Sequence, residues 1–319
     1  MEALLAPLAL IVERAFGYPP QIFRAIGHPV VGMGRLITWL ERALNHASDP
    51  ADTRRRAGIA MLLALIGATL LICLGIREIT RNIPYGWIIE ALLASSLLAQ
   101  KELGRAVRAV ADAGSIEDAR EAVGHIVGRD TAELDESGIA KAAIESLAES
   151  SSDAVVAPLF WMMIFGLPGI AVYKAINTAD SMVGHRDERY LRFGWASARL
   201  DDLANWIPAR LTALLVAGAA FFLKGAEPER AWTTAMRDAK KHDSPNAGWP
   251  EAAFAGALGI ALGGPRTYQG DTHELPQFGD GRSALVADDI RGALMLYDRL
   301  LNVVLAVAVL VALVVWRAS

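Results

Sequence analysis

Residues 145–210 read ESLAESSSDAVVAPLFWMMIFGLPGIAVYKAINTADSMVGHRDERYLRFGWASARLDDLANWIPAR, and this stretch decides the fold. Within it, residues 154–173 carry no charge over a length that crosses a bilayer as a helix. Lys, Asn, Asp, Ser, His and Arg follow at once. Polar side chains are costly at a membrane edge, so they commonly have a function. We expect the rest of the chain to support this stretch and one later string, DAKKHDSPNAGWPE at residues 238–251.

The apolar run contains helix-breaking residues. Pro158 lies near its start, and Gly166-Leu167-Pro168-Gly169 lies near its centre. A broken helix is tolerated at membrane depth where the break is buried in protein. We therefore predict a re-entrant helical hairpin at 154–180, with both ends on the same side, in place of one straight span.

Composition places the whole chain in a membrane. Of 319 residues, 53% are hydrophobic and 21% charged, and the mean hydropathy is +0.31. The hydrophobic residues fall in long blocks with at most one charge each: 57–76, 83–100, 154–173, 207–223 and 300–316. Since no segment alternates as a strand would, we predict an all-α, polytopic integral membrane helical bundle. We treat 1–319 as a single membrane-embedded domain, with a cytoplasmic helical segment at about 101–150.

Basic residues set the expected orientation. Arg54, Arg55 and Arg56 precede the first block, and Lys101 and Arg105 follow the second. Basic residues favour the cytoplasmic side, so 57–100 is predicted to be a helical hairpin with both flanks in the cytoplasm. The expected location is the inner membrane, with a cytoplasmic active site. A net charge of −4 argues against a nucleic-acid partner.

Three acids share one helical face before the apolar run. Glu145, Glu149 and Asp153 are spaced four residues apart. A solvated acidic face is the better explanation for Glu145. For Glu149 and Asp153, at the edge of the apolar run, binding Mg²⁺ or orienting substrate is an equal alternative to that explanation.

Polar residues continue on the far side of the run. Lys174, Asn177 and Ser181 fall on one helical face with Asp180 beside it, which suits a phosphate or carboxylate clamp. A lysine here also commonly extends toward the interface without binding anything.

A second polar group follows in residues 199–210. Asp201 and Asp202 share a helix surface with Asn205, which suits Mg²⁺, and helix-terminal acids are the simpler alternative. Arg199 and Arg210 flank the acids, and arginine suits phosphate oxygens.

The later string adds a third polar group. Lys241 and His242 lie three and four residues after Asp238 on a helix, and a turn at Ser244-Pro245-Asn246 precedes a helix expected to begin at Pro250 with Glu251 in its first turn. A helix N-terminus beside a polar turn suits an anion. The usual phosphate-loop, dinucleotide and zinc motifs are missing from the sequence.

Four strings in this order resemble the CobD/CbiB family of cobalamin biosynthesis, the adenosylcobinamide-phosphate synthases. They are HPVVGMGRLITWLE (28–41), ESLAESSSDAVVAPLFW (145–161), YKAINTADSMVGHRDERYLRFGWASARLDDLANWIPARLTA (173–213) and DAKKHDSPNAGWPEAAFAGALG (238–259). One departure concerns the family pattern A-E-N-x-x-D-G at residues 148–154. Ser150 replaces its Asn and Ala154 its Gly, while Glu149 and Asp153 are kept.

The resemblance implies an amide-forming ligase. Family members join the free propionate of adenosylcobyric acid to (R)-1-aminopropan-2-ol or its O-phosphate, with ATP as the energy source. Activating the carboxylate requires Mg²⁺, cations near the phosphates and a proton acceptor. On this hypothesis the catalytic residues are His242 as base, Lys174 and Asp202. The metal ligands are Glu149, Asp153, Asp201 and Asp202. Substrate and phosphate are bound by Asn177, Asp180, Ser181, Arg199, Asn205, Arg210, Lys241, Ser244, Asn246 and Glu251.

Two other functions stay open. A transporter of a corrinoid or another anion also places polar residues at broken membrane helices, but it should keep ionisable groups inside the spans, whereas the centres of 57–76 and 300–316 have none. A non-catalytic membrane scaffold for other corrinoid-pathway proteins is the third reading. The choice of amine, the number of spans, the need for a partner protein and the oligomeric state are not determined by the sequence.

Overall fold

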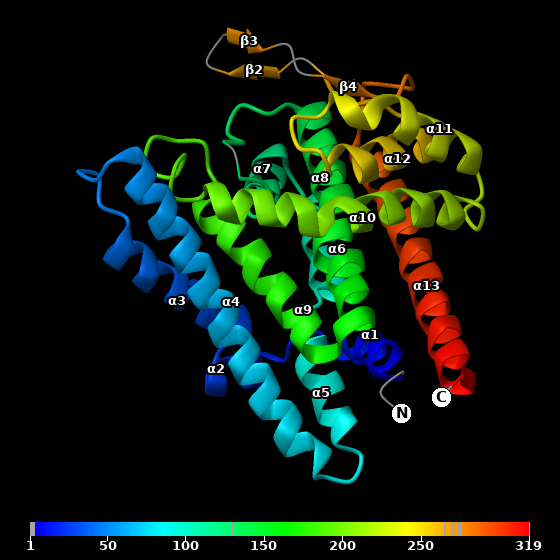
Figure 1. Cartoon of the computed structure of the whole chain (residues 1–319). Coiled ribbons are helices and arrows are strands. Elements are labelled where there is room, and N and C mark those ends of the chain that lie inside the picture. The colour runs from blue at the N-terminus through cyan, green and yellow to red at the C-terminus, as the bar shows by residue number, and fades with distance from the viewer. Residues whose placement is uncertain (1–3, 129, 265, 269–270, 274–275, 319) are drawn as a thin grey trace. The chain divides into compact units, whose positions relative to one another are not determined.

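The computed structural model describes residues 4–128, 130–264, 266–268, 271–273 and 276–318, and these are almost entirely helical (Figure 1). The predicted all-α fold is confirmed. The chain forms two compact units. Unit 1 comprises Met1–Ala99, Ala157–Asn205 and Ala308–Ser319, and unit 2 comprises Gln100–Val156 and Trp206–Val307.

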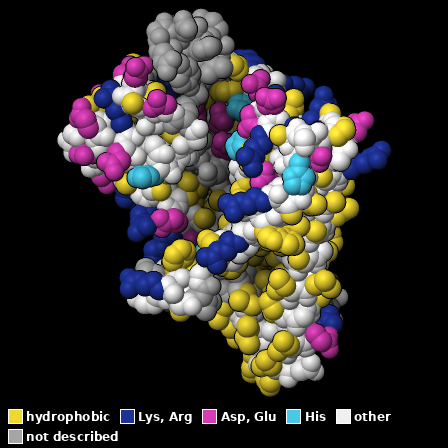
Figure 2. Space-filling model, turned by 90° about the vertical axis from the view of Figure 1, so that its left-hand side faces the viewer, with side chains coloured by type: hydrophobic (Ala, Val, Ile, Leu, Met, Phe, Trp, Pro, Cys, Tyr) yellow, Lys and Arg dark blue, Asp and Glu magenta, His cyan; other side chains and the backbone are white. Residues whose placement is uncertain are grey.

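The membrane interpretation is supported by four segments that are long and apolar enough to cross a bilayer. They are helix α4 (Ala51–Arg81), the run Glu136–Val183, helix α10 (Trp195–Ala220) and helix α13 (Ala287–Ala318). Exposed apolar side chains cover much of α4, among them Leu63, Leu71 and Ile72. Figure 2, which looks onto the side that carries α3 and α4, shows hydrophobic side chains over its lower part and Lys and Arg across its middle.

One predicted span is wrong. In residues 83–100 the helix α5 (Gly86–Ser95) is only ten residues long, about 15 Å or half the thickness of the hydrocarbon core, and a new helix begins at Gln100. The left-handed Tyr85 (φ 60°) precedes it. At its end, the hydroxyls of Ser95 and Ser96 donate to the carbonyls of Leu92 and Leu93, in competition with helix continuation. The hairpin with α4 is present, with a short second arm.

Unit 1 packs its helices around an apolar core. Ile37 of α3, Met61 and Leu65 of α4, Ala175 of α9 and Phe193 are all fully buried in one cluster. The helices that belong wholly to this unit, besides α4 and α5, are α1 (Leu5–Phe16), α2 (Pro20–Ile26), α3 (Pro29–Leu44) and α9 (Ala157–Val183).

Helix α9 is broken at Gly166. This glycine has φ 66° and ψ −148°, a conformation open essentially to glycine alone. In a straight helix Ala157 and Tyr173 would lie about 24 Å apart, yet they belong to one buried cluster, with Trp161 packed against it. The chain therefore reverses at the break, and Gly169 allows the close approach, because a Cβ there would collide with the carbonyl oxygen of Trp161. The predicted helical hairpin is confirmed.

Unit 2 is built around α8. The chain enters it through α6 and α7, and at the end of α8 the helix widens into a π-helical turn. Its elements are α6 (Gln100–Ala111), α7 (Ile116–Gly124), α8 (Glu136–Ser151), the π-turn η2 (Ser152–Val156), α11 (Pro228–Asp238), the 3₁₀ turn η3 (Ala239–Lys241) and α12 (Gly248–Leu258).

Four short strands, which the sequence did not suggest, follow α12. β1 (Leu262–Gly263) pairs antiparallel with β4 (Gln277–Phe278), and β2 (Arg266–Tyr268) pairs with β3 (Asp271–His273). The β1–β4 pair brings Phe278 opposite Leu262 and thereby holds one wall of the cavity described below.

We predict that Gly166→Ala lowers the free energy of unfolding by about 1–3 kcal/mol, because alanine is strained at this backbone conformation. Denaturant titration of the purified protein measures the change. Gly67→Ala in α4 is the matched control, since a Cβ there meets open space; it should be neutral or slightly stabilising. Equal stability of Gly166→Ala and wild type would show that the break does not depend on glycine.

Candidate functional site

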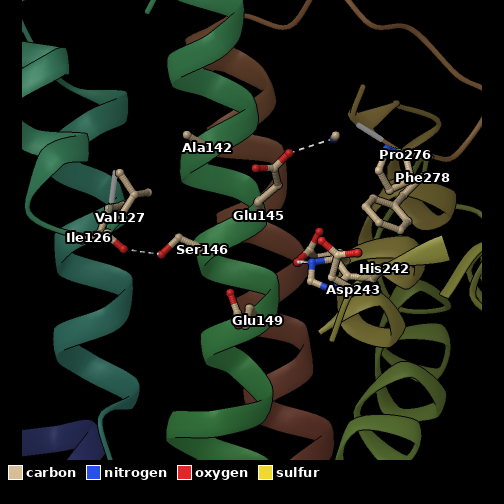
Figure 3. A pocket seen from close by; sticks show the side chains of 13 residues that line it. Ile126, Val127, Ala142, Glu145, Ser146, Glu149, His242, Asp243, Pro276 and Phe278 are labelled. Carbon is tan, nitrogen blue, oxygen red and sulfur yellow. Dashed lines mark hydrogen bonds and ion pairs between the residues drawn. The ribbon is translucent and has the colours of Figure 1, made fainter. Parts of the chain in front are cut away.

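A cavity of about 470 Å³ in unit 2 is lined by acids (Figure 3). Glu145, Glu149 and Ser146 reach it from α8, and His242 and Asp243 lie across it. Its other lining residues are Ile126, Val127, Gly128, Ala142, Glu251, Gly263, Pro276 and Phe278. The volume is typical of a small-molecule site. Four carboxylates and no lysine or arginine appear among the described lining residues, so the cavity favours a cationic group.

On the α8 side of the cavity, the expected solvation of Glu145 is wrong. Glu145 does not lie on a solvated face: it is 9% exposed, and its Oε1 accepts a 2.8 Å hydrogen bond from the backbone N–H of Gly263. The Ser146 hydroxyl donates to the carbonyl of Ile126 at 2.9 Å. Glu149, one turn further along α8, is exposed and lines the cavity. Asp153 lies in the π-turn, where the α-helical spacing of the three acids is lost.

His242 is fixed by its neighbours. Its Nδ1 accepts a 2.8 Å hydrogen bond from the N–H of Ser244, and its Nε2 lies 3.6 Å from Oε1 of Glu251. Burial lowers the pKa of His242, so the ring is neutral at pH 7. With Nδ1 as an acceptor, we assign the ring proton to Nε2, on the side of Glu251. The pair can therefore exchange a proton with a ligand mainly through the carboxylate.

The turn before α12 holds the predicted polar residues in place. The Ser244 hydroxyl accepts hydrogen bonds from the N–H groups of Asn246 and Ala247, both at 3.2 Å. Helix α12 begins at Gly248, two residues before the expected start at Pro250. Glu251 is nevertheless in its first turn and is 5% exposed.

Arg210 is stacked between two aromatic rings. Its guanidinium lies 4.2 Å from the ring centre of Trp206 and 4.8 Å from that of Trp249. It donates to the Trp206 carbonyl at 2.6 Å and approaches Oδ1 of Asn246 at 3.5 Å. These contacts fix the guanidinium, and phosphate binding by Arg210 stays a prediction.

Asp238, fully buried, is the centre of an ion-pair network. Arg237 donates to both its oxygens at 2.8 Å, Lys241 lies 2.7 Å from Oδ1, and the N–H of Gly279 donates to Oδ2 at 2.8 Å. Burial alone would raise the pKa of Asp238, but these donors lower it well below its usual range. Hydrogen bonds from Arg230 and Arg237 lower the pKa of Asp280 to about 2. Lys241, predicted to bind phosphate, is thus already paired.

Unit 1 contains a second polar group, which joins α9 to α10. Tyr173 donates to Oδ1 of Asn205 at 2.9 Å, and Asn205 donates to Oδ2 of Asp201 at 3.0 Å. Asn177 donates to Oδ1 of Asp201 at 3.3 Å. Three predicted residues therefore form one hydrogen-bonded chain, in which both oxygens of Asp201 accept amide hydrogens.

The remaining predicted residues of unit 1 surround this chain. Lys174, Asp180 and Asp202 are half-buried, and Arg199 is exposed. The Ser181 hydroxyl donates to the carbonyl of Asn177 at 2.9 Å within its own helix, which is a common local bond for serine.

Metal binding by these residues stays a prediction. Among the residues that the structure describes, no three His, Cys, Asp or Glu side chains are grouped closely enough to hold a metal ion. The side chains present therefore suit Mg²⁺ only where phosphate oxygens and water complete its shell, which is the usual arrangement for this ion in phosphate-binding sites.

The predicted residues fall into two sets. Lys174, Asn177, Asp180, Ser181, Arg199, Asp201, Asp202 and Asn205 lie in unit 1, and Glu149, Asp153, Arg210, Lys241, His242, Ser244, Asn246 and Glu251 lie in unit 2. That the two sets act in one site stays a prediction. Sequence reasoning did not select Tyr173, Asp243 or Phe278. The first two are next to the selected residues Lys174 and His242 in the sequence. Nothing in the sequence around Phe278 indicates a site, because its position depends on the pairing of β4 with β1.

Comparison with known proteins gives a consistent result. A family model described as CobD/Cbib protein matches residues 6–297. Similar proteins include those of Brucella suis biovar 1 (46% identical over 98% of both chains), Sinorhizobium fredii (47% over 93% of this chain and 92% of the relative) and Rhodobacter capsulatus (46% over 99% of both). Each is named "Cobalamin biosynthesis protein CobD". No solved structure matches.

We predict that Asp238→Asn lowers the free energy of unfolding by about 1.5–3 kcal/mol at pH 7, because charge-assisted hydrogen bonds are lost. The lowered pKa of Asp238 adds a pH dependence. The ionised Asp238 makes its full contribution to the free energy of unfolding above about pH 5. That contribution is lost as the pH falls below about 3.9, the ordinary pKa of an aspartate.

Denaturant titrations of wild type and Asp238→Asn between pH 7 and pH 3 measure this pH dependence. The difference in the free energy of unfolding between the two proteins should shrink toward low pH. Asp280→Asn is the control. The Asp280 side chain is 59% exposed, so this substitution should lower the free energy of unfolding by less. A difference that is independent of pH would contradict the ion-pair assignment.

Proposed function

The chain belongs to the CobD/CbiB family, and from this premise we propose that it acts in cobalamin biosynthesis as an amide-forming ligase. The substrates are the free propionate of adenosylcobyric acid and aminopropanol or its phosphate, and ATP drives the reaction. The product is adenosylcobinamide or its phosphate.

The proposed reaction has two steps. The propionate carboxylate first takes the terminal phosphoryl group of ATP, which gives an acyl phosphate and ADP. The neutral amine then attacks the acyl carbon, the C–N bond forms, inorganic phosphate leaves, and a protein group accepts the proton of the amine. Mg²⁺ would neutralise phosphate charge during the first step.

The acid-lined cavity of unit 2 carries this proposal. An amine is cationic at pH 7, so four surrounding carboxylates attract it, and they would repel a nucleotide that arrived without its metal ion. The cavity also exceeds the needs of a small amino alcohol, which leaves room for a substrate arm beside it.

We assign proton transfer to the pair His242–Glu251. The sequence suggested His242 alone as the base. Since Nδ1 already accepts the Ser244 N–H, the carboxylate of Glu251 is the better acceptor, and Nε2 of His242 lies 3.6 Å from its Oε1. Asp243 and Glu149 line the same cavity and hold the ammonium group before the transfer.

The phosphoryl end of the reaction is assigned to the polar group of unit 1. Lys174 and Arg199 supply positive charge for phosphate oxygens. Asp202 is half-buried next to Asp201, whose oxygens are held by Asn177 and Asn205. That makes Asp202 the preferred ligand for the metal ion of ATP, and Asp201 its rigid neighbour.

We predict that Asp202→Ala abolishes product formation while the protein remains folded in membranes. Membranes that contain the protein are incubated with adenosylcobyric acid, Mg-ATP and either amine, and the amide is detected by mass spectrometry. Asp298→Ala, which removes an exposed acid of α13, is the control and should retain activity. Absence of product from wild type with both amines would favour the transporter or scaffold reading.

We predict that Glu251→Gln lowers kcat by about 10²–10⁴-fold, the usual contribution of a general base. The acidic limb of the pH–rate profile should disappear in the variant, because that limb reports titration of the base. Glu229→Gln, an exposed acid in the first turn of α11, is the matched control. An unchanged profile in Glu251→Gln would remove this residue from proton transfer.

A further inference from the structure

Helix α3 presents a groove that the proposed reaction does not use. The α3 groove has a volume of about 500 Å³ and is lined by residues of α3 and by Met182 of α9; the α3 residues are Val31, Gly34, Arg35, Thr38, Trp39 and Arg42. A Cβ at Gly34 would lie 3.4 Å from Sδ of Met182, so the Met182 side chain lies against α3 at this glycine. Most of its lining residues belong to the string 28–41, which the sequence singled out without assigning a role.

The charge of the α3 groove is positive. Arg35 and Arg42 are both exposed, and within the part of the chain that the structure describes neither forms a hydrogen bond or an ion pair. The acid of the same helix, Glu41, is buried and turned away. It accepts two hydrogen bonds from Arg189, at 2.8 and 3.0 Å, and one from Asn45 at 3.2 Å.

The same groove also presents apolar surface. The Trp39 side chain is 65% exposed and Val31 is 40% exposed. Tryptophan on a membrane protein is enriched where hydrocarbon meets headgroups, because its ring is apolar and its N–H polar. On the preceding α2, Ile22 and Phe23 are 43% and 51% exposed. A soluble phosphate ligand would not need this apolar surface.

The orientation of unit 1 is consistent with a lipid at this place. Six residues separate α3 from α4, whose first turns contain Arg54, Arg55 and Arg56. Basic residues at the start of a span favour the cytoplasmic leaflet. That leaflet carries anionic lipids, which attract basic residues at the membrane surface.

We propose that the α3 groove binds the headgroup of an anionic phospholipid. Arg35 and Arg42 are about 10 Å apart along the helix axis, and their long side chains converge on one phosphate between them. The glycerol and the first acyl carbons lie against Trp39, Val31 and Met182. This lipid holds α3 at the membrane surface and is independent of the ligase reaction.

Binding is tested on the full-length protein in detergent. Dioleoyl phosphatidylglycerol and dioleoyl phosphatidylcholine are titrated separately, and bound lipid is counted by native mass spectrometry. Wild type should prefer phosphatidylglycerol by about tenfold or more, and Arg35→Gln/Arg42→Gln should lose that preference, since each arginine contributes comparably to binding. Arg35→Lys/Arg42→Lys keeps the charge and should retain most of the preference.

Two controls separate the alternatives. Arg81→Gln/Arg105→Gln makes the same change in net charge at exposed arginines outside the groove and should keep the preference. Trp39→Ala should weaken the binding of both lipids equally and so leave the preference for phosphatidylglycerol unchanged. Loss of the preference in the Arg81/Arg105 control, or its retention in Arg35→Gln/Arg42→Gln, would overturn the proposal. Displacement of phosphatidylglycerol by millimolar inorganic phosphate would also overturn it, by identifying a soluble anion as the ligand.

Discussion

Backbone hydrogen bonding in an apolar environment is the constraint on which unit 1 depends. A helix that breaks at membrane depth leaves amide and carbonyl groups without partners, and no water is present to satisfy them. The two arms on either side of the break at Gly166 pack on one another, while Ile164 and Phe165 just before the break are exposed. Ala157 and Tyr173 meet in one buried cluster, and the Trp161 indole donates to the Ala204 carbonyl at 3.1 Å. The reversal also brings Tyr173 and Asn177 against the start of α10, where they form the chain of hydrogen bonds to Asp201.

Buried carboxylates follow a related rule in both units. An ionised carboxylate away from water is unfavourable unless donors surround it. Glu41 is held by Arg189, and Asp238 by two cations and a backbone N–H, whereas the donors to Asp201 are the neutral amides of two asparagines. Because each arrangement leaves the carboxylate one geometry, these acids are better suited to positioning their neighbours than to reacting. The acids that line the cavity of unit 2 differ, since they border a space that a ligand can enter.

This contrast gives the proposed reaction its division of labour. Activation of a carboxylate by ATP needs positive charge and a metal ion, whereas the attack of an amine needs a negative environment and a proton acceptor. Lys174, Arg199 and Asp202 have the first character, and Glu149, Asp243 and Glu251 have the second. The proposed two-step amide synthesis assigns one step to each of these groups.

The sequence by itself determined the helical class, the membrane location, the break near Gly166 and the strings that carry the family resemblance. These are local properties: charge-free length, helix-breaking residues and the order of side chains along the chain. It failed for residues 83–100, because apolar composition does not reveal that the helix ends at Ser95. It also misjudged Glu145, since the N–H that buries and binds this acid belongs to Gly263, 118 residues further along the chain. Only the tertiary structure decided which acids are tied to neighbours and which face a cavity, because those contacts join segments whose separation in sequence leaves no local pattern.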